Sequence, residues 1–290
     1  FIGFAVIAGA IRIFLTWANT RLAFSTGADL GIEVYRRTLY QPYWVHASQN
    51  SNEVISGITI KTNLVVFDVL VPLLTIFSAT LLVIAIMVTL IAIDPVVASV
   101  AGAGFGICYA LVTWISRRQL NRNSHHVAQE QTQVLKALQE GLGGIRDVLL
   151  DGVQEFYCDV FHKADKTLRR AQGSTVFISL SPRYAMEALG MVVIAALAYF
   201  LSQQPGGIST AFPVLGLLAL GAQRLLPSLQ QIYYAWASIV GSQASLADTL
   251  ALLDQPLPEE QLKTTTSPLP FQEDVRLDGV HFRYNKEAPW

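Results

Sequence analysis

Charged residues are scarce in this 290-residue chain: they make up 14% of it, against 52% for hydrophobic residues. Because a soluble domain carries about 25% charge, this deficit indicates long segments that lie in lipid. The chain has 20 Lys and Arg against 21 Asp and Glu, for a net charge of -1. Without a basic excess to neutralise phosphates, nucleic acid is not expected as a partner.

Cysteine and catalytic motifs are also lacking. Cys108 and Cys158 are too few for a disulfide framework, and the adjacent His125 and His126 project about 100° apart on a helix, a poor arrangement for one metal ion. Neither Gly-x-Ser-x-Gly nor the phosphate-binding Gly-x-x-x-x-Gly-Lys-Ser/Thr occurs. We therefore expect no metal site, no catalytic residue and no ATP hydrolysis by this chain alone.

Uncharged runs, by contrast, are long enough to cross a bilayer. A hydrocarbon core of about 30 Å needs about 20 helical residues, and one central charge costs about 2.5–3.5 kcal/mol. Between Lys61 and Arg117 the charged residues are Asp68 and Asp94 alone, and a turn rich in Gln, Gly and Ser at 202–210 divides a later run. Five spans are predicted, at residues 1–24, 69–93, 95–116, 183–201 and 211–239.

Basic residues collect at one end of these spans, which predicts their orientation. The turns at 94–95 and 202–210 contain no Lys or Arg, so the opposite, basic ends should face the cytoplasm. A cytoplasmic C-terminus then places Phe1 outside, and we interpret the start as truncated, with an earlier span missing. The prediction is a multi-pass protein of the cell inner (plasma) membrane. The basic residues beside the spans are Arg36, Arg37, Arg117, Arg118, Arg122, Lys163, Lys166, Arg169 and Arg170.

Some helices are predicted to extend well beyond the lipid. One helix from Pro95 to Gly141 would be about 69 Å long at about 1.5 Å per residue, more than twice the hydrocarbon thickness. Short helices are expected in two cytosolic breaks that separate the long helices, 41–53 and 141–152, as docking surfaces for another domain or as ordinary loops. The residues in question are Tyr43, Trp44, Val45 and His46 in the first and Ile145, Arg146, Asp147 and Val148 in the second.

The character of the chain changes after residue 254. Four prolines between 255 and 273 indicate an extended linker that ends the transmembrane domain, residues 1–254. Val275, Leu277, Val280, Phe282 and Tyr284 then approximate the alternation of a β-strand. Residues 274–290 are predicted to begin a second, truncated domain.

This order of features resembles the transmembrane half of an ABC exporter of the half-transporter type. The resemblance covers almost the whole chain and rests on the long hairpins, the Asp94-Pro95 turn, residues 138–147 and the strand pattern at 275–284. It implies an all-α membrane protein with long transmembrane helices and cytosolic extensions, followed by the first strand of a truncated α/β nucleotide-binding domain.

The resemblance also implies partners and roles. The short helices at 42–50 and 144–151 would be coupling helices, and Tyr284 would stack on adenine in the intact protein, which would bind ATP and Mg²⁺. A second half-transporter is implied, as a homodimer or a heterodimer, together with a nucleotide-binding domain, membrane lipid and an amphipathic substrate moved by alternating access.

Three intramembrane arginines are candidates for a substrate cavity. Arg12, Arg183 and Arg224 are costly in lipid unless they face a cavity or a partner, and a guanidinium suits a phosphate or pyrophosphate. Arg183 also has Glu187 at i+4, which predicts an ion pair.

The arginines do not identify the transported substrate, and several alternatives follow. Residues 181–187 together with Arg224 look most like the branch that contains lipid-linked oligosaccharide flippases. A peptide or drug exporter, whose arginines would pair internally, is one alternative, and a membrane scaffold or receptor without a motor is another.

Overall fold

The structure is a computed structural model that describes residues 2–48, 51–93, 95–202, 207–257, 274, 276 and 278–281. These residues form helices and connecting turns, with no β-strand among them. The strand pattern at 275–284 lies largely outside the described residues, so the predicted strand stays a prediction. The helical elements are α1 (Ile2–Leu39), α2 (Tyr43–Ser48), α3 (Ser51–Ser56), η1 (Gly57–Lys61), α4 (Thr62–Val65), η2 (Val66–Leu70), α5 (Val71–Ile93), α6 (Pro95–Gly143), α7 (Ile145–Asp151), α8 (Gln154–Ser202), α9 (Gly207–Gly241) and α10 (Gln243–Leu253).

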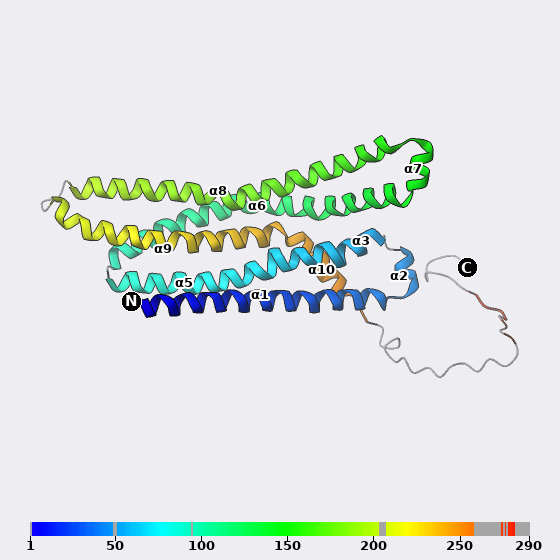
Figure 1. Cartoon of the computed structure of the whole chain (residues 1–290), viewed down its shortest axis with the longest axis horizontal. Helices are drawn as coiled ribbons and strands as arrows, with labels where there is room; N and C mark the ends of the chain where they lie inside the picture. The colour runs from blue at the N-terminus through cyan, green and yellow to red at the C-terminus, as the bar shows by residue number, and fades with distance from the viewer. Residues whose placement is uncertain are drawn as a thin grey trace.

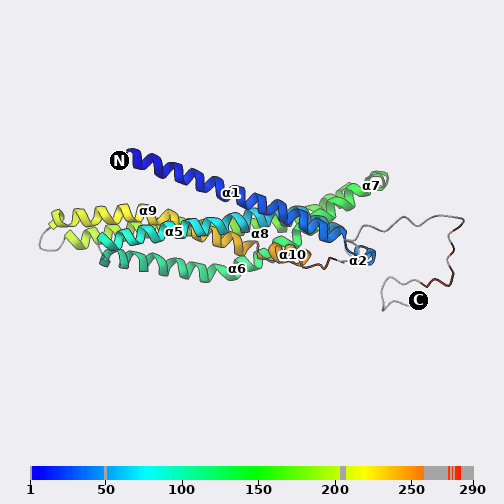
Figure 2. The same ribbon diagram turned by 90° about the horizontal axis from the view of Figure 1, so that it is seen from below.

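The long helices α1, α5, α6, α8 and α9 run lengthwise along the bundle (Figure 1). Helix α5 is the last segment of a longer rod, called here the composite helix, which joins α3, η1, α4, η2 and α5 end to end, and its segments η1 and η2 are π-helical. The last residues of α5 and α8 and the first residues of α6 and α9 lie at one end of the bundle, and α2 and α7 lie at the other (Figures 1 and 2). This arrangement agrees with the predicted hairpins, because both pairs of helices meet at the end without basic residues.

The long helices confirm that the chain extends beyond a bilayer. Helices α6 and α8 each contain 49 residues, about 73 Å at about 1.5 Å per residue. Pro95 begins α6, a position where its missing N–H costs no helical hydrogen bond. Among the side chains that the structure describes, one helical stretch, Val54–Ala92, is long and apolar enough to cross a membrane, with 17% of its most apolar window buried.

The start of α9 corrects one expectation. Residues 207–210 were predicted to belong to a turn, but α9 begins at Gly207, four residues before the predicted start of the last span. Small and hydroxyl-bearing residues are compatible with the first turn of a helix, so this part of the turn signal marks a helix start. Residues 203–206 and Asp94 lie outside the described residues.

The core of the bundle lies where α6, α8 and α9 meet. Its buried residues are Tyr109, Leu120, Met186, Tyr233 and Ala237. Helix α1 packs against the composite helix. At Gly27 the two helices approach so closely that a Cβ added to this glycine would lie 2.4 Å from Val66 Cγ2. Small residues allow such close helix contacts, which stabilise bundles in lipid.

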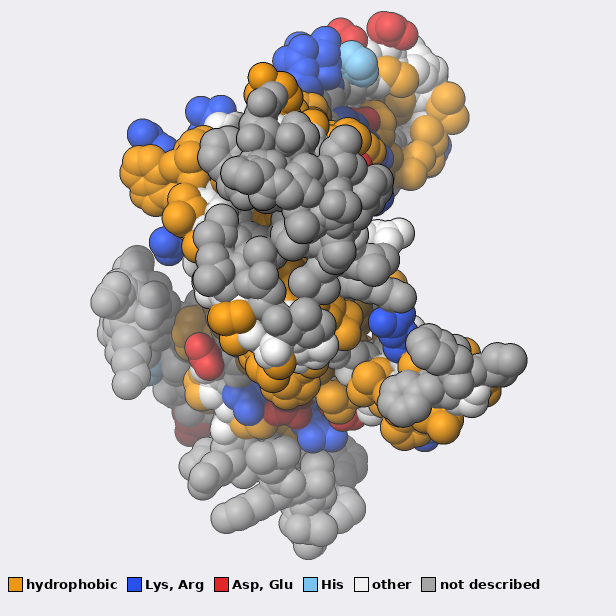
Figure 3. Space-filling model, turned by 90° about the vertical axis from the view of Figure 1, so that its left-hand side faces the viewer, with side chains coloured by type: hydrophobic (Ala, Val, Ile, Leu, Met, Phe, Trp, Pro, Cys, Tyr) orange, Lys and Arg blue, Asp and Glu red, His pale blue; other side chains and the backbone are white. Residues whose placement is uncertain are grey.

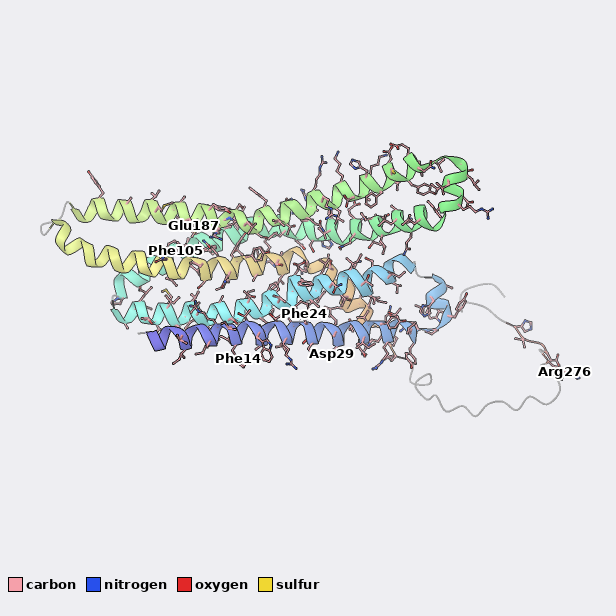
Figure 4. The ribbon with its side chains drawn as sticks, viewed as in Figure 1. Phe14, Phe24, Asp29, Phe105, Glu187 and Arg276 are labelled. Carbon is pink, nitrogen blue, oxygen red and sulfur yellow. The ribbon has the colours of Figure 1, made fainter. Side chains whose placement is uncertain are left out.

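Large hydrophobic side chains also remain on the outside of the bundle. Phe14 points away from it, whereas Phe24 points toward the composite helix and contacts Phe67 edge-on, with ring centroids 5.2 Å apart (Figure 4). When the bundle is viewed from the end where α6 begins, hydrophobic side chains of the described residues also lie on its surface (Figure 3). This pattern suits a protein whose sides are covered by lipid rather than by water.

Candidate functional site

The connection between α6 and α8 folds into a separate short helix, α7. The amides of Asp147 and Val148 donate to the Gly144 carbonyl at 2.9 and 3.0 Å, which forms its first turn. Gly152 ends it with φ of 66°, a left-handed conformation that glycine adopts without steric cost, and its amide donates to the Val148 carbonyl. The two glycines therefore hold α7 across the ends of the two long helices (Figure 1).

Helix α7 presents an apolar surface, but one predicted residue does not belong to it. Ile145 is exposed, as are Arg146 and Asp147, whereas Val148 is only 6% exposed. A side chain that packs inward cannot dock onto another domain, so Val148 anchors α7 to the bundle instead. The neighbouring Leu149 and Leu150, 60% and 73% exposed, take its place on the surface.

Helix α2 forms the matching tip between α1 and the composite helix. The amide of Val45 donates to the Pro42 carbonyl at 2.9 Å, so the turn begins at the proline, as expected from its fixed φ. Tyr43 and Trp44 are 72% and 52% exposed, His46 is exposed and Val45 is half-buried. The structure thus places both predicted sets of tip residues at the same end of the molecule.

A charged pair that the sequence analysis missed connects the composite helix to α10. Lys61, at the end of η1, is buried and its Nζ lies 2.5 Å from Oδ2 of Asp248, 187 positions away. Asp68, in η2, accepts hydrogen bonds from Ser238 at 3.2 Å and Ser242 at 3.3 Å. Ser238 lies in the last turn of α9 and Ser242 is the residue between α9 and α10. The composite helix therefore bonds to this junction through Asp68 and to α10 through Lys61.

Further contacts attach α10 to two other helices. The Ala244 amide donates to Ser124 Oγ on α6 at 2.8 Å. Arg37 of α1 donates to the Leu253 carbonyl, and Gln41 donates to the Pro256 carbonyl at 2.9 Å. The segment that leaves the bundle is therefore bonded to α1, α6 and the composite helix. The sequence did not reveal α10 as a separate helix, because partners so distant in sequence carry no spacing signal.

The predicted cavity arginines are not brought together by the described contacts. Arg183 Nε donates to Glu187 Oε1 at 3.0 Å on the exposed side of α8, which confirms the predicted ion pair. Arg12 is exposed on α1. Among the described residues, no hydrogen bond or ion pair joins Arg12 to Arg183. The side chain of Arg224 and the whole of Tyr284 lie outside the described residues.

The structure gives no sign of a metal centre in the part it describes: no three His, Cys, Asp or Glu side chains there lie close enough to share an ion. Within that same part, Cys108 and Cys158 are free thiols, Cys108 half-buried and Cys158 exposed.

Comparison with known proteins identifies a family for this chain. The family model described as ABC transporter transmembrane region matches residues 1–210, from α1 into the first turn of α9. No curated protein matches the chain.

Proposed function

The chain belongs to the family of ABC transporter transmembrane regions, and on that premise we propose that it moves an amphipathic substrate across the membrane as part of an ATP-driven exporter or flippase. Family membership makes it a membrane protein and the membrane part of an ABC transporter. The proposal adds alternating access, a second half-transporter as homodimer or heterodimer, and a cytoplasmic C-terminus in the inner (plasma) membrane.

The observation that carries the proposal is the pair of exposed apolar tips, α2 and α7, at one end of long rods. Leu149, Leu150, Tyr43 and Trp44 would face water unless a protein covered them. Each tip continues directly into helices that run the length of the bundle (Figure 2). A nucleotide-binding domain that contacts both tips could therefore move the transmembrane helices when ATP and Mg²⁺ bind to it.

The tips can be tested by removing apolar surface from α7. Leu149→Ser with Leu150→Ser, introduced into the intact transporter, should reduce substrate-stimulated ATPase activity at least tenfold while ATP binding by the nucleotide-binding domain persists. The matched control is Val176→Ser with Phe177→Ser, two exposed side chains on α8 far from α7. Unchanged stimulation in the α7 variant would refute a coupling role.

For the substrate, we propose an anionic amphiphile such as a lipid-linked oligosaccharide. The Arg183–Glu187 pair leaves Arg224 as the main candidate for a pyrophosphate, because a guanidinium already paired with a carboxylate is a poor anion site. Arg224→Ala in the intact transporter should abolish ATPase stimulation by a pyrophosphate lipid, whereas Arg169→Ala on the cytosolic part of α8 should not.

A peptide or drug exporter is the second candidate, and the same ion pair favours it, since internal pairing is what an apolar cavity requires. Stimulation of the wild-type transporter by an apolar peptide or drug, and not by the pyrophosphate lipid, would support this alternative.

A further inference from the structure

One exposed face of α6 changes from apolar to basic within two helical turns. Ile107, Leu111, Trp114 and Ile115 are 68%, 54%, 77% and 64% exposed, and their spacing puts them on one face. The same face continues with Arg118 and then Arg122, both exposed, and Arg117 lies beside them.

Within the described residues, these arginines have no anionic partner. Helix α6 contains no Asp or Glu from Pro95 to Gln129. In the part of the chain that the structure describes, no carboxylate forms an ion pair with Arg117, Arg118 or Arg122. By contrast, Arg37, Arg169 and Arg183 are each paired with a carboxylate of their own helix.

We propose that Arg118 and Arg122 bind the phosphate groups of anionic phospholipids, with Trp114 at the level of the headgroups. Tryptophan favours the membrane–water interface, and basic residues directly beyond a span attract anionic lipid. A guanidinium can donate two parallel hydrogen bonds to a phosphate. The apolar side chains at 107–115 would contact the acyl chains of the same lipid.

The position of α6 agrees with this occupant. The first part of α6 lies on the side of the bundle opposite α1 (Figure 2), and Ile107, Trp114 and Ile115 are exposed in this chain. An apolar face that continues into unpaired positive charge complements a phospholipid along its length, from acyl chain to phosphate. The inference depends on the membrane location that family membership gives, and not on the substrate or coupling proposed above.

The test measures retention of phosphatidylglycerol by the full chain in phosphatidylcholine nanodiscs, titrated with phosphatidylglycerol and read by native mass spectrometry. Each arginine near an anionic surface contributes roughly fivefold to lipid affinity, so Arg118→Gln with Arg122→Gln should weaken retention about twenty-five-fold. The control, Lys163→Gln with Lys166→Gln, removes the same charge from α8. Asn123, next to Arg122, donates a hydrogen bond to Thr175, so Thr175 marks the level of the arginines on α8. At about 1.5 Å per residue, the two lysines lie on the order of 15 Å farther from the lipid.

Conservative substitution separates lipid binding from misfolding. Arg118→Lys with Arg122→Lys keeps both charges and should restore most of the retention. Equal loss in the control, or unchanged retention in the Gln variant, would overturn the proposal. An intermolecular disulfide through Ile107→Cys, in a Cys108→Ala, Cys158→Ser background, would also overturn it, because a second copy of the chain would then cover this face.

Discussion

Tyr233 on α9 donates a hydrogen bond to the carbonyl of Ile178 on α8, with the two oxygens 3.1 Å apart. That carbonyl lies four residues before Pro182, which is inside α8 and has no N–H to offer it. A carbonyl left unbonded inside a membrane protein costs free energy, so Tyr233 stabilises α8 at its proline. The contact also explains how a 49-residue helix continues through a buried proline.

Replacing the two core tyrosines with phenylalanine should therefore change the free energy of unfolding differently. Tyr233→Phe removes a hydrogen bond and should lower the free energy of unfolding by about 1 kcal/mol. The Tyr109 hydroxyl is buried and has no hydrogen-bond partner among the described residues, so Tyr109→Phe should be neutral or stabilising. Thermal unfolding in detergent, followed by tryptophan fluorescence, would compare the two variants.

A double-mutant cycle tests the reason for this difference. In a Pro182→Ala background the new amide can bond to the Ile178 carbonyl, so Tyr233→Phe should cost less there than in the wild type. If both backgrounds lose the same stability, the hydroxyl does not compensate for the proline.

The Lys61–Asp248 pair should respond asymmetrically to substitution. Asp248→Asn leaves the buried ammonium of Lys61 without its partner and should destabilise the protein by about 1–3 kcal/mol. Breaking a fully buried pair costs about 3–5 kcal/mol, and the cost is lower here because Asp248 is 46% exposed. Lys61→Met leaves only a solvated carboxylate and should cost little. The unfolding midpoint in detergent measures both effects.

The double variant Lys61→Met with Asp248→Asn provides the control for that prediction. It should recover most of the stability lost in Asp248→Asn, since no buried charge remains unpaired. Equal losses in both single variants would show that the pair acts through packing rather than charge.

The left-handed conformation of Gly152 predicts a local effect at the α7 tip. Gly152→Ala at φ of 66° should cost about 1–2 kcal/mol, because a Cβ meets the following carbonyl in this conformation. Amide hydrogen exchange over residues 145–153 should become faster. Gly143→Ala, at the end of α6 with open space around its Cβ position, should leave exchange unchanged or slower. Faster exchange in Gly143→Ala than in Gly152→Ala would show that the left-handed conformation of Gly152 does not determine the stability of α7.

Local patterns predicted several elements correctly and missed others. The tip helix at 145–151 and the Arg183–Glu187 pair follow from glycine positions and i,i+4 spacing, and the structure confirms both. On the cytosolic part of α8 a further i,i+4 pair joins Arg169 to Asp165, and the sequence analysis did not single it out. The π-helical segments and α10 were also missed, because a wider helical turn and a helix break are decided by contacts with other helices.

By itself the sequence determined that this protein crosses a membrane and that its helices extend past the lipid, since charge and hydrophobicity act locally and are visible in every segment. The tertiary structure alone decided that Val148 is buried while Leu149 is exposed, and that Lys61 meets Asp248. A residue's burial and a long-range partner depend on how separate helices pack, and that packing is a property of the whole bundle.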